Sequence, residues 1–174
     1  DGFSAAYATH YRLYKGDRPP LFDQPLSAMI RTASADNAVT DSAAAATAMA
    51  TGVKTNNDMV GMAPDGKKLK TILEAAKESG KSTGLVSTSS VTHATPASFA
   101  AKVPDRDDEV AIAPQMLGKP DVLLGGGKQF FLPESEGGKQ PERNLIEEAR
   151  AQGYQLRGDR DQLFKAKGNK LLGL

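Results

Sequence analysis

The sequence predicts an α/β fold in which a layered, largely parallel central sheet is flanked by helices. Two patterns along the chain point to this class. Segments with the apolar spacing of a helix alternate with short apolar runs that are typical of buried strands. Parallel strands need long crossover connections, and helices usually provide them. The composition agrees, since 39% hydrophobic and 25% charged residues are typical of a globular protein.

Three helices are predicted in the first half of the chain. The first covers residues 4–14, and an extended segment precedes Asp41. The second begins at or near Ser42, because the run of alanines that follows strongly favours a helix. The third covers residues 69–78, where apolar residues have helical spacing, and Gly80 ends it.

The second half is predicted to alternate between strands and helices. Short apolar or β-branched runs mark the strands, and helical spacing of apolar residues marks the helices. The predicted elements are a strand at residues 81–88, a helix at 105–117, a strand at 121–124 that glycines stop, a helix at 142–152, a short strand at 154–156, a helical stretch at 159–166 and an element that begins at 170.

The Asp41-Ser42 pair stands where the extended segment enters the second predicted helix. Unpaired N–H groups and the helix dipole favour an anion at a helix N-terminus, so a serine there is well placed to carry a phosphate. An ordinary N-cap formed by Asp41 or Ser42 explains the same residues and is the commoner situation. Spacing alone leaves both interpretations open.

Three segments carry longer motifs. Residues 39–55 contain Val-Thr-Asp-Ser-Ala and then Thr-Gly-Val-Lys-Thr. Residues 82–97 end in Thr-His-Ala-Thr-Pro-Ala and precede Arg106, and residues 120–127 join a strand to three glycines. In this order the segments resemble the nucleophile motif, the magnesium- and phosphate-binding stretch, and the following strand and glycine turn of alkaline phosphatases.

The resemblance implies metal-dependent hydrolysis of phosphate monoesters. In this family a zinc ion activates a serine, a phosphoseryl intermediate forms, and a water on a second zinc displaces the serine. Ser42 is then the nucleophile, two zinc ions and one magnesium ion are the cofactors, small phosphate monoesters are the substrates, and inorganic phosphate is released. The resemblance also implies a periplasmic or secreted protein and a possible homodimer.

Two further catalytic residues are implied by the same resemblance. Arg106 would grip two phosphate oxygens through its planar guanidinium, and Asp41 would orient this arginine. The residues alone allow other roles. Asp41 could act only as a helix cap, and Arg106, which stands beside Asp105, Asp107 and Asp108, could be one charge in a solvated loop.

Four metal ligands are implied by the resemblance: Asp1, Ser42, His93 and Thr95. Thr95 matches a hydroxyl ligand of the magnesium site, and His93 stands where relatives have aspartate or histidine. Because Pro96 disfavours a helical conformation of the residue before it, both side chains are expected on one face of an extended segment. The alternatives that remain open are a histidine hydrogen-bonded within a loop and a threonine that caps a helix.

The family's other zinc ligands, three histidines among them, come from the later half of its chains. This sequence contains two histidines, His10 and His93. Residues 1–174 are therefore expected to be the N-terminal part of a single alkaline phosphatase-like catalytic domain, with an incomplete fold and no activity in isolation. The alternative is a noncatalytic α/β module that binds phosphate or a partner at the Ser42 helix terminus and Arg106.

Charge and cysteine content exclude several classes of function. The 22 basic and 21 acidic residues nearly balance, which argues against nucleic-acid binding through a broad basic surface. No segment is long and apolar enough to predict a membrane span. The chain has no cysteine, so disulfides and thiolate zinc sites within it are excluded.

Overall fold

The structure is a computed structural model that describes residues 5–16, 30 and 32–174. The chain divides into two compact units, Asp1–Thr32 and Ala33–Leu174. The described residues of the first unit form α1 (Ala5–Lys15), which confirms the helix predicted at residues 4–14 to within one residue. Gly16 follows it at φ 62° and donates its N–H to the carbonyl of Arg12 at 3.1 Å.

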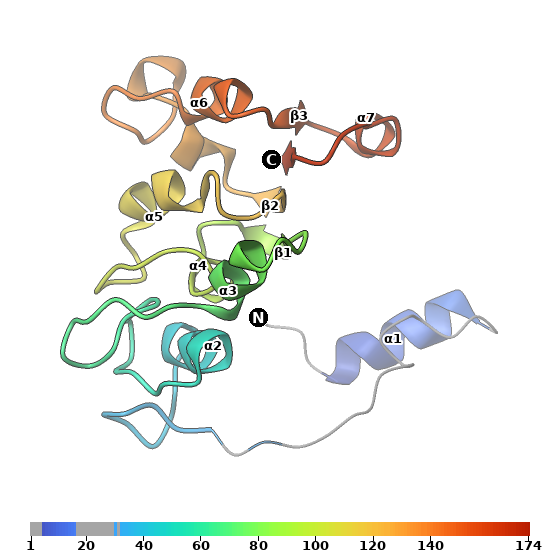
Figure 1. Cartoon of the computed structure of the whole chain (residues 1–174). Helices are drawn as coiled ribbons and strands as arrows, with labels where there is room; N and C mark the ends of the chain where they lie inside the picture. Colours follow the sequence, from blue (N-terminus) through green and yellow to red (C-terminus); the bar gives the residue numbers. More distant parts are fainter. Residues whose placement is uncertain (1–4, 17–29, 31) are drawn as a thin grey trace. The chain divides into compact units, whose positions relative to one another are not determined.

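A parallel sheet forms the centre of the second unit (Figure 1). Among the described residues it has four strands in the order β1-β2-β4-β3, and every neighbouring pair is parallel. This arrangement confirms the predicted α/β class with a largely parallel sheet. The strands are β1 (Gly84–Ser90), β2 (Val122–Gly126), β3 (Gln155–Arg157) and β4 (Leu171–Gly173).

One face of this sheet carries a row of leucines. Leu123 lies between Leu85 and Leu172 in register, and Leu172 also pairs with Leu156. Leu123 and Leu172 are fully buried, and Leu85 and Leu156 pack against the same core. Burying each such side chain stabilises the fold by roughly 1.5–3 kcal/mol. The largest other buried side chains of this core are Phe131, Ile112, Met116 and Leu145.

The helices of the second unit mostly begin at a side chain that accepts a hydrogen bond from the first turn. Thr71 and Glu74 form a capping box, and Asp41, Asn144 and Asp159 are further caps. The helices are α2 (Ser42–Thr51), α3 (Ile72–Glu78), α4 (Ala94–Ala97), α5 (Glu109–Met116), α6 (Leu145–Ala151) and α7 (Arg160–Phe164), and the 3-10 helices are η2 (Lys128–Phe131) and η3 (Glu134–Glu136). Within the residues that the structure describes, no helix has the length and apolar character needed to cross a bilayer.

A proline inside α5 illustrates how a distant side chain completes the backbone hydrogen bonding. Pro114 has no N–H, so it cannot donate to the carbonyl of Val110 one turn earlier. The buried side chain of Gln140 donates to this carbonyl instead, at 3.0 Å, and also to the carbonyl of Phe130 at 2.8 Å. Gln140 therefore ties the end of a connecting segment to α5.

The strand predicted at residues 121–124 is longer than expected, because β2 continues through Gly126. Gly125 lies so close to the end of β1 that a Cβ on it would be 2.8 Å from the side chain of Val91. Glycine permits this approach. Two glycines that were expected to stop the strand therefore belong to it.

Candidate active site

Ser42 is the first residue of α2, and Asp41 is its N-cap. Asp41 has an extended backbone, at φ −85° and ψ 179°, and its Oδ1 accepts a hydrogen bond from the Ala44 N–H at 2.8 Å. The alanines after Ser42 favour the helix, and the cap fixes where it begins. The half-buried Ser42 therefore lies at the helix end where N–H groups and the dipole favour an anion.

The second carboxylate oxygen of Asp41 faces two donors. It accepts from Nη1 of Arg106 at 3.0 Å and from the N–H of Asp58 at 3.1 Å. Burial opposes ionisation of Asp41, but the hydrogen bonds from Ala44, Asp58 and Arg106 outweigh it and lower the pKa of this carboxyl below its ordinary value. Asp41 is therefore an anion at neutral pH, and it is both a cap and the partner of Arg106.

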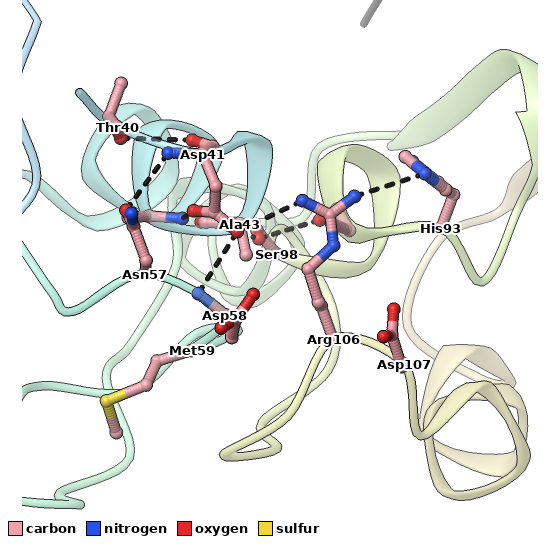
Figure 2. Close-up of polar contacts among 12 residues, drawn as sticks. Thr40, Asp41, Ala43, Asn57, Asp58, Met59, His93, Ser98, Arg106 and Asp107 are labelled. Carbon is pink, nitrogen blue, oxygen red and sulfur yellow. Dashed lines mark hydrogen bonds and ion pairs between the residues drawn. The ribbon is translucent and has the colours of Figure 1, made fainter.

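Arg106 lies between Asp41 and His93 (Figure 2). Its Nη2 is 3.2 Å from Nε2 of His93, and 19% of its side chain is exposed. Two of the neighbouring aspartates have other partners, since Asp105 accepts from the Asp107 N–H and Asp108 caps α5. Arg106 is thus held by a residue 65 positions away in sequence, and it is not merely one charge in an acidic loop.

The loop after α2 contributes two residues that the sequence analysis did not identify. Oδ1 of Asn57 accepts from the Asp41 N–H at 3.0 Å, and Nδ2 of Asn57 donates to the carbonyl of Val39 at 3.2 Å. The next residue, Asp58, donates its N–H to Oδ2 of Asp41. These three hydrogen bonds join residues 16 to 18 positions apart, so no local sequence pattern predicts them.

His93 and Thr95 do not lie in an extended segment, and that prediction is wrong. His93 is the N-cap residue of α4, and Thr95 lies within the first turn of this helix. Pro96 does not prevent the helix, because the N–H groups of the first turn have no partner within the helix in any case. Of the two side chains, His93 is the one in contact with Arg106.

Buried hydroxyl groups anchor the segment before His93. Thr92 is fully buried, and its Oγ1 donates to a carboxylate oxygen of Glu109 at the start of α5. The hydroxyl of Ser90, at the end of β1, is hydrogen-bonded to the same Thr92 oxygen. The position of His93 therefore follows from the end of β1 on one side and from α5 on the other.

A complete metal site does not fit the described residues alone. Among them, no three His, Cys, Asp or Glu side chains lie close enough together to hold a metal ion. Of the four implied ligands, Asp1 lies outside the described residues. Ser42 is the first residue of α2, Thr95 lies in the first turn of α4, and His93 is the N-cap of α4 with its Nε2 3.2 Å from Nη2 of Arg106.

Comparison with known proteins gives a consistent result. The family model described as alkaline phosphatase matches residues 1–174. Alkaline phosphatase 3 of Bacillus subtilis is 43% identical over 189 aligned positions, which cover 100% of this chain and 39% of that protein. The chain thus spans about 40% of the length of this protein and of Alkaline phosphatase 4 of Bacillus subtilis.

Solved structures agree with the sequence relatives. The cold-active alkaline phosphatase of Shewanella sp. superposes with a TM-score of 0.81 at 37% identity, covering 100% of this chain and 44% of that one. A mutant alkaline phosphatase of the Antarctic bacterium TAB5, in which a histidine is replaced by aspartate, has Mg bound in its M3 site. It superposes with a TM-score of 0.81 at 30% identity, covering 98% of this chain and 49% of that one.

Proposed function

The chain belongs to the alkaline phosphatase family, and from this premise we propose that the whole protein hydrolyses phosphate monoesters through a phosphoserine at Ser42. The observation that carries the proposal is the ion pair between Asp41 and Arg106 beside the helix end that begins at Ser42. A guanidinium and a helix N-terminus are two groups that favour phosphate, and this supports Ser42 as the residue that carries it.

The reaction would proceed in two displacements. In the first, Oγ of Ser42 forms a bond to phosphorus, the ester P–O bond breaks, and the serine proton leaves the hydroxyl while the alcohol departs protonated. In the second, the oxygen of water forms the new P–O bond and gives up a proton, the bond to Oγ of Ser42 breaks, and the serine oxygen takes up a proton as inorganic phosphate is released. Both steps need an oxygen nucleophile and a stabilised phosphate charge.

Arg106 would bind two phosphate oxygens with the N–H groups that Asp41 and His93 leave available. A guanidinium has five N–H donors in one plane, and two of its contacts here hold that plane in place. Asp41 stays ionised because its pKa is lowered, so its ion pair with Arg106 persists at neutral pH. The N-terminus of α2 adds favourable electrostatics for the phosphoryl group.

We further propose two zinc ions and one magnesium ion as cofactors, with Asp1, Ser42, His93 and Thr95 as the ligands that this chain contributes. When bound, such ions make oxygen nucleophiles available and neutralise phosphate charge. The Mg-bound relative supports the metal class. We also propose that residues 1–174 form the N-terminal part of one catalytic domain and are inactive in isolation, since the chain covers 39% of the length of Alkaline phosphatase 3.

The remaining proposals follow from family membership. Small phosphate monoesters and inorganic phosphate are the proposed ligands, without nucleic-acid-specific binding, and the protein is proposed to act as a homodimer in the periplasm or after secretion. Cell fractionation tests the location. Light scattering on the purified full-length protein tests the oligomeric state.

Turnover of p-nitrophenyl phosphate tests the proposed activity. The full-length protein, supplied with zinc and magnesium, should release nitrophenol, and Ser42→Ala should lose that activity while it keeps its circular dichroism spectrum. Equal turnover in the variant would remove Ser42 as the nucleophile. An inactive but phosphate-binding wild type would favour the noncatalytic module.

A further inference from the structure

The loop that follows α2 makes a set of hydrogen bonds directed at the residues around Ser42. Asn57 bridges the extended segment before Ser42, since its side chain accepts from the Asp41 N–H at 3.0 Å and donates to the Val39 carbonyl at 3.2 Å. Its own N–H donates to Oδ1 of Asp36 at 3.0 Å, which holds Asn57 from the other side. This side chain thereby fixes the path of the chain into α2 (Figure 2).

Asp58 acts through its main chain. Its N–H donates to Oδ2 of Asp41, the oxygen that Arg106 also contacts. To present this N–H, residue 58 adopts φ 68°, and within the described part of the chain it is the only residue other than glycine with positive φ. Aspartate tolerates this left-handed conformation better than most residues, and β-branched residues tolerate it worst.

Capping of α2 does not require the hydrogen bonds that Asn57 and Asp58 make with Asp41. The cap uses Oδ1 of Asp41 and the N–H of Ala44, whereas Asp58 holds Oδ2, the oxygen that faces Arg106. A carboxylate held at both oxygens has a fixed plane, and a guanidinium paired with it has a fixed direction.

We propose that Asn57 and Asp58 are positioning residues for phosphate binding, because they fix Asp41 and, through it, the guanidinium of Arg106 relative to Ser42. This inference rests on the proposed function of Ser42 and Arg106. Neither residue needs to touch the phosphate.

Substitutions at Asp58 separate its main-chain role from its charge. Asp58→Gly and Asp58→Asn keep the N–H and the left-handed conformation, so both should bind inorganic phosphate, measured as a competitive inhibitor of the full-length enzyme, within about twofold of wild type. Asp58→Val should raise the inhibition constant by about tenfold, because valine disfavours positive φ and displaces the N–H. Equal losses in the glycine and asparagine variants would show that the carboxylate itself matters and would overturn the proposal for Asp58.

Asn57→Ala tests the other residue, with Asn56→Ala as the neighbouring control. Asn57→Ala should lower kcat/KM and raise the phosphate inhibition constant by about tenfold, whereas Asn56→Ala should leave both unchanged. Rates are taken per active site, titrated by the burst of nitrophenol, so a loss of folded protein is not counted. An Asn57→Ala variant with a smaller burst but unchanged constants would show a purely structural role and overturn the proposal.

A double-mutant cycle separates this inference from the proposed function. If Asn57 acts through Arg106, the Asn57→Ala change should raise the phosphate inhibition constant by less than about twofold in an Arg106→Ala background. Full additivity would overturn the coupling. If Arg106→Ala alone leaves phosphate inhibition unaltered, the proposed function of Arg106 fails, whatever the result at Asn57.

Discussion

The guanidinium of Arg106 donates to the carboxylate of Asp41 at 3.0 Å, and only 19% of either side chain is exposed. An ion pair sheltered in this way keeps more of its attraction than one in open solvent. The pair connects the N-terminus of α2 to the loop before α5. It therefore fixes Asp41 and Arg106 relative to each other.

Replacing Asp41 by asparagine separates its two roles. Asparagine caps helices about as well as aspartate, so any loss in the free energy of unfolding should come from the Arg106 ion pair and not from the cap. The charge that holds Arg106 is lost, and a hydrogen bond to a charged group contributes about 1.5–3 kcal/mol, so kcat/KM should fall roughly ten- to hundredfold. Steady-state kinetics and urea unfolding measure the two effects.

Asp159→Asn is the matched control for this change. Asp159 caps α7 by accepting from the Gln162 N–H at 2.8 Å, and it is exposed. This variant should match wild type in both stability and activity. Equal activity losses at positions 41 and 159 would contradict an orienting role for Asp41.

Replacing Arg106 by lysine tests whether the planar guanidinium is needed. Lysine keeps the positive charge but is a compact point charge, so it cannot hold Asp41 and two phosphate oxygens in one plane. The Michaelis constant and the phosphate inhibition constant should both rise by about tenfold or more. Unchanged phosphate inhibition in Arg106→Lys would argue against bidentate binding.

The ionised Glu74 should make the free energy of unfolding depend on pH in the acid range. Burial opposes its ionisation, but the Thr71 N–H and the ammonium groups of Lys102 and Lys119 outweigh burial and lower the pKa of Glu74 to about 2. A lowered pKa stabilises the folded state above the ordinary value of 4.5, and the gain disappears as pH falls towards 2. Burial lowers the pKa of Lys102, which offsets part of this gain.

The difference in unfolding free energy between wild type and Glu74→Gln should therefore be constant near neutral pH and shrink between pH 4.5 and about 2. Urea unfolding across this range measures it, with the exposed Glu142→Gln as the control. A difference that does not depend on pH would show that the ionised carboxylate of Glu74 does not stabilise the fold.

A side chain at position 127, directly after β2, should clash with Ser90. Gly127 has φ 92°, and a Cβ there would lie 2.2 Å from Oγ of Ser90. Gly153 has a similar φ of 88°, with nothing within 4 Å of the added atom. Gly153→Ala should therefore lose only the backbone term of about 1–2 kcal/mol, and Gly127→Ala should lose more. Equal losses in thermal unfolding would show that the contact with Ser90 is relieved without cost.

Much of the fold could be predicted from local patterns. The alanine run after Ser42 and the apolar spacing before Gly80 give α2 and the body of α3, and the alternation of helices with apolar strands gives the parallel sheet. The start of α3 is shifted because Thr71 supplies the cap, which selects the first residue more strongly than apolar spacing does. Local rules failed at α4, where Thr95-Pro96 suggested extended chain but the proline falls in a first turn.

The candidate site depended on information that local patterns lack. Ser42 could be placed at a helix terminus from its neighbours, whereas the pairing of Arg106 with Asp41 followed only from the family resemblance. Asn57 and Asp58 were missed, because their role arises from hydrogen bonds that form only when the loop folds back onto the start of α2. The hydrogen bond of Thr92 to Glu109 is of the same tertiary kind.

Ser42 is proposed to carry the phosphoryl group during turnover. The most direct measurement is peptide mass spectrometry of the full-length protein, quenched in acid during steady-state hydrolysis of p-nitrophenyl phosphate, with Ser42→Ala alongside. We expect a phosphate on the peptide that contains Ser42, absent without substrate and absent in the variant. Continued turnover with no phosphate on Ser42, or with the phosphate on another residue, would contradict the account.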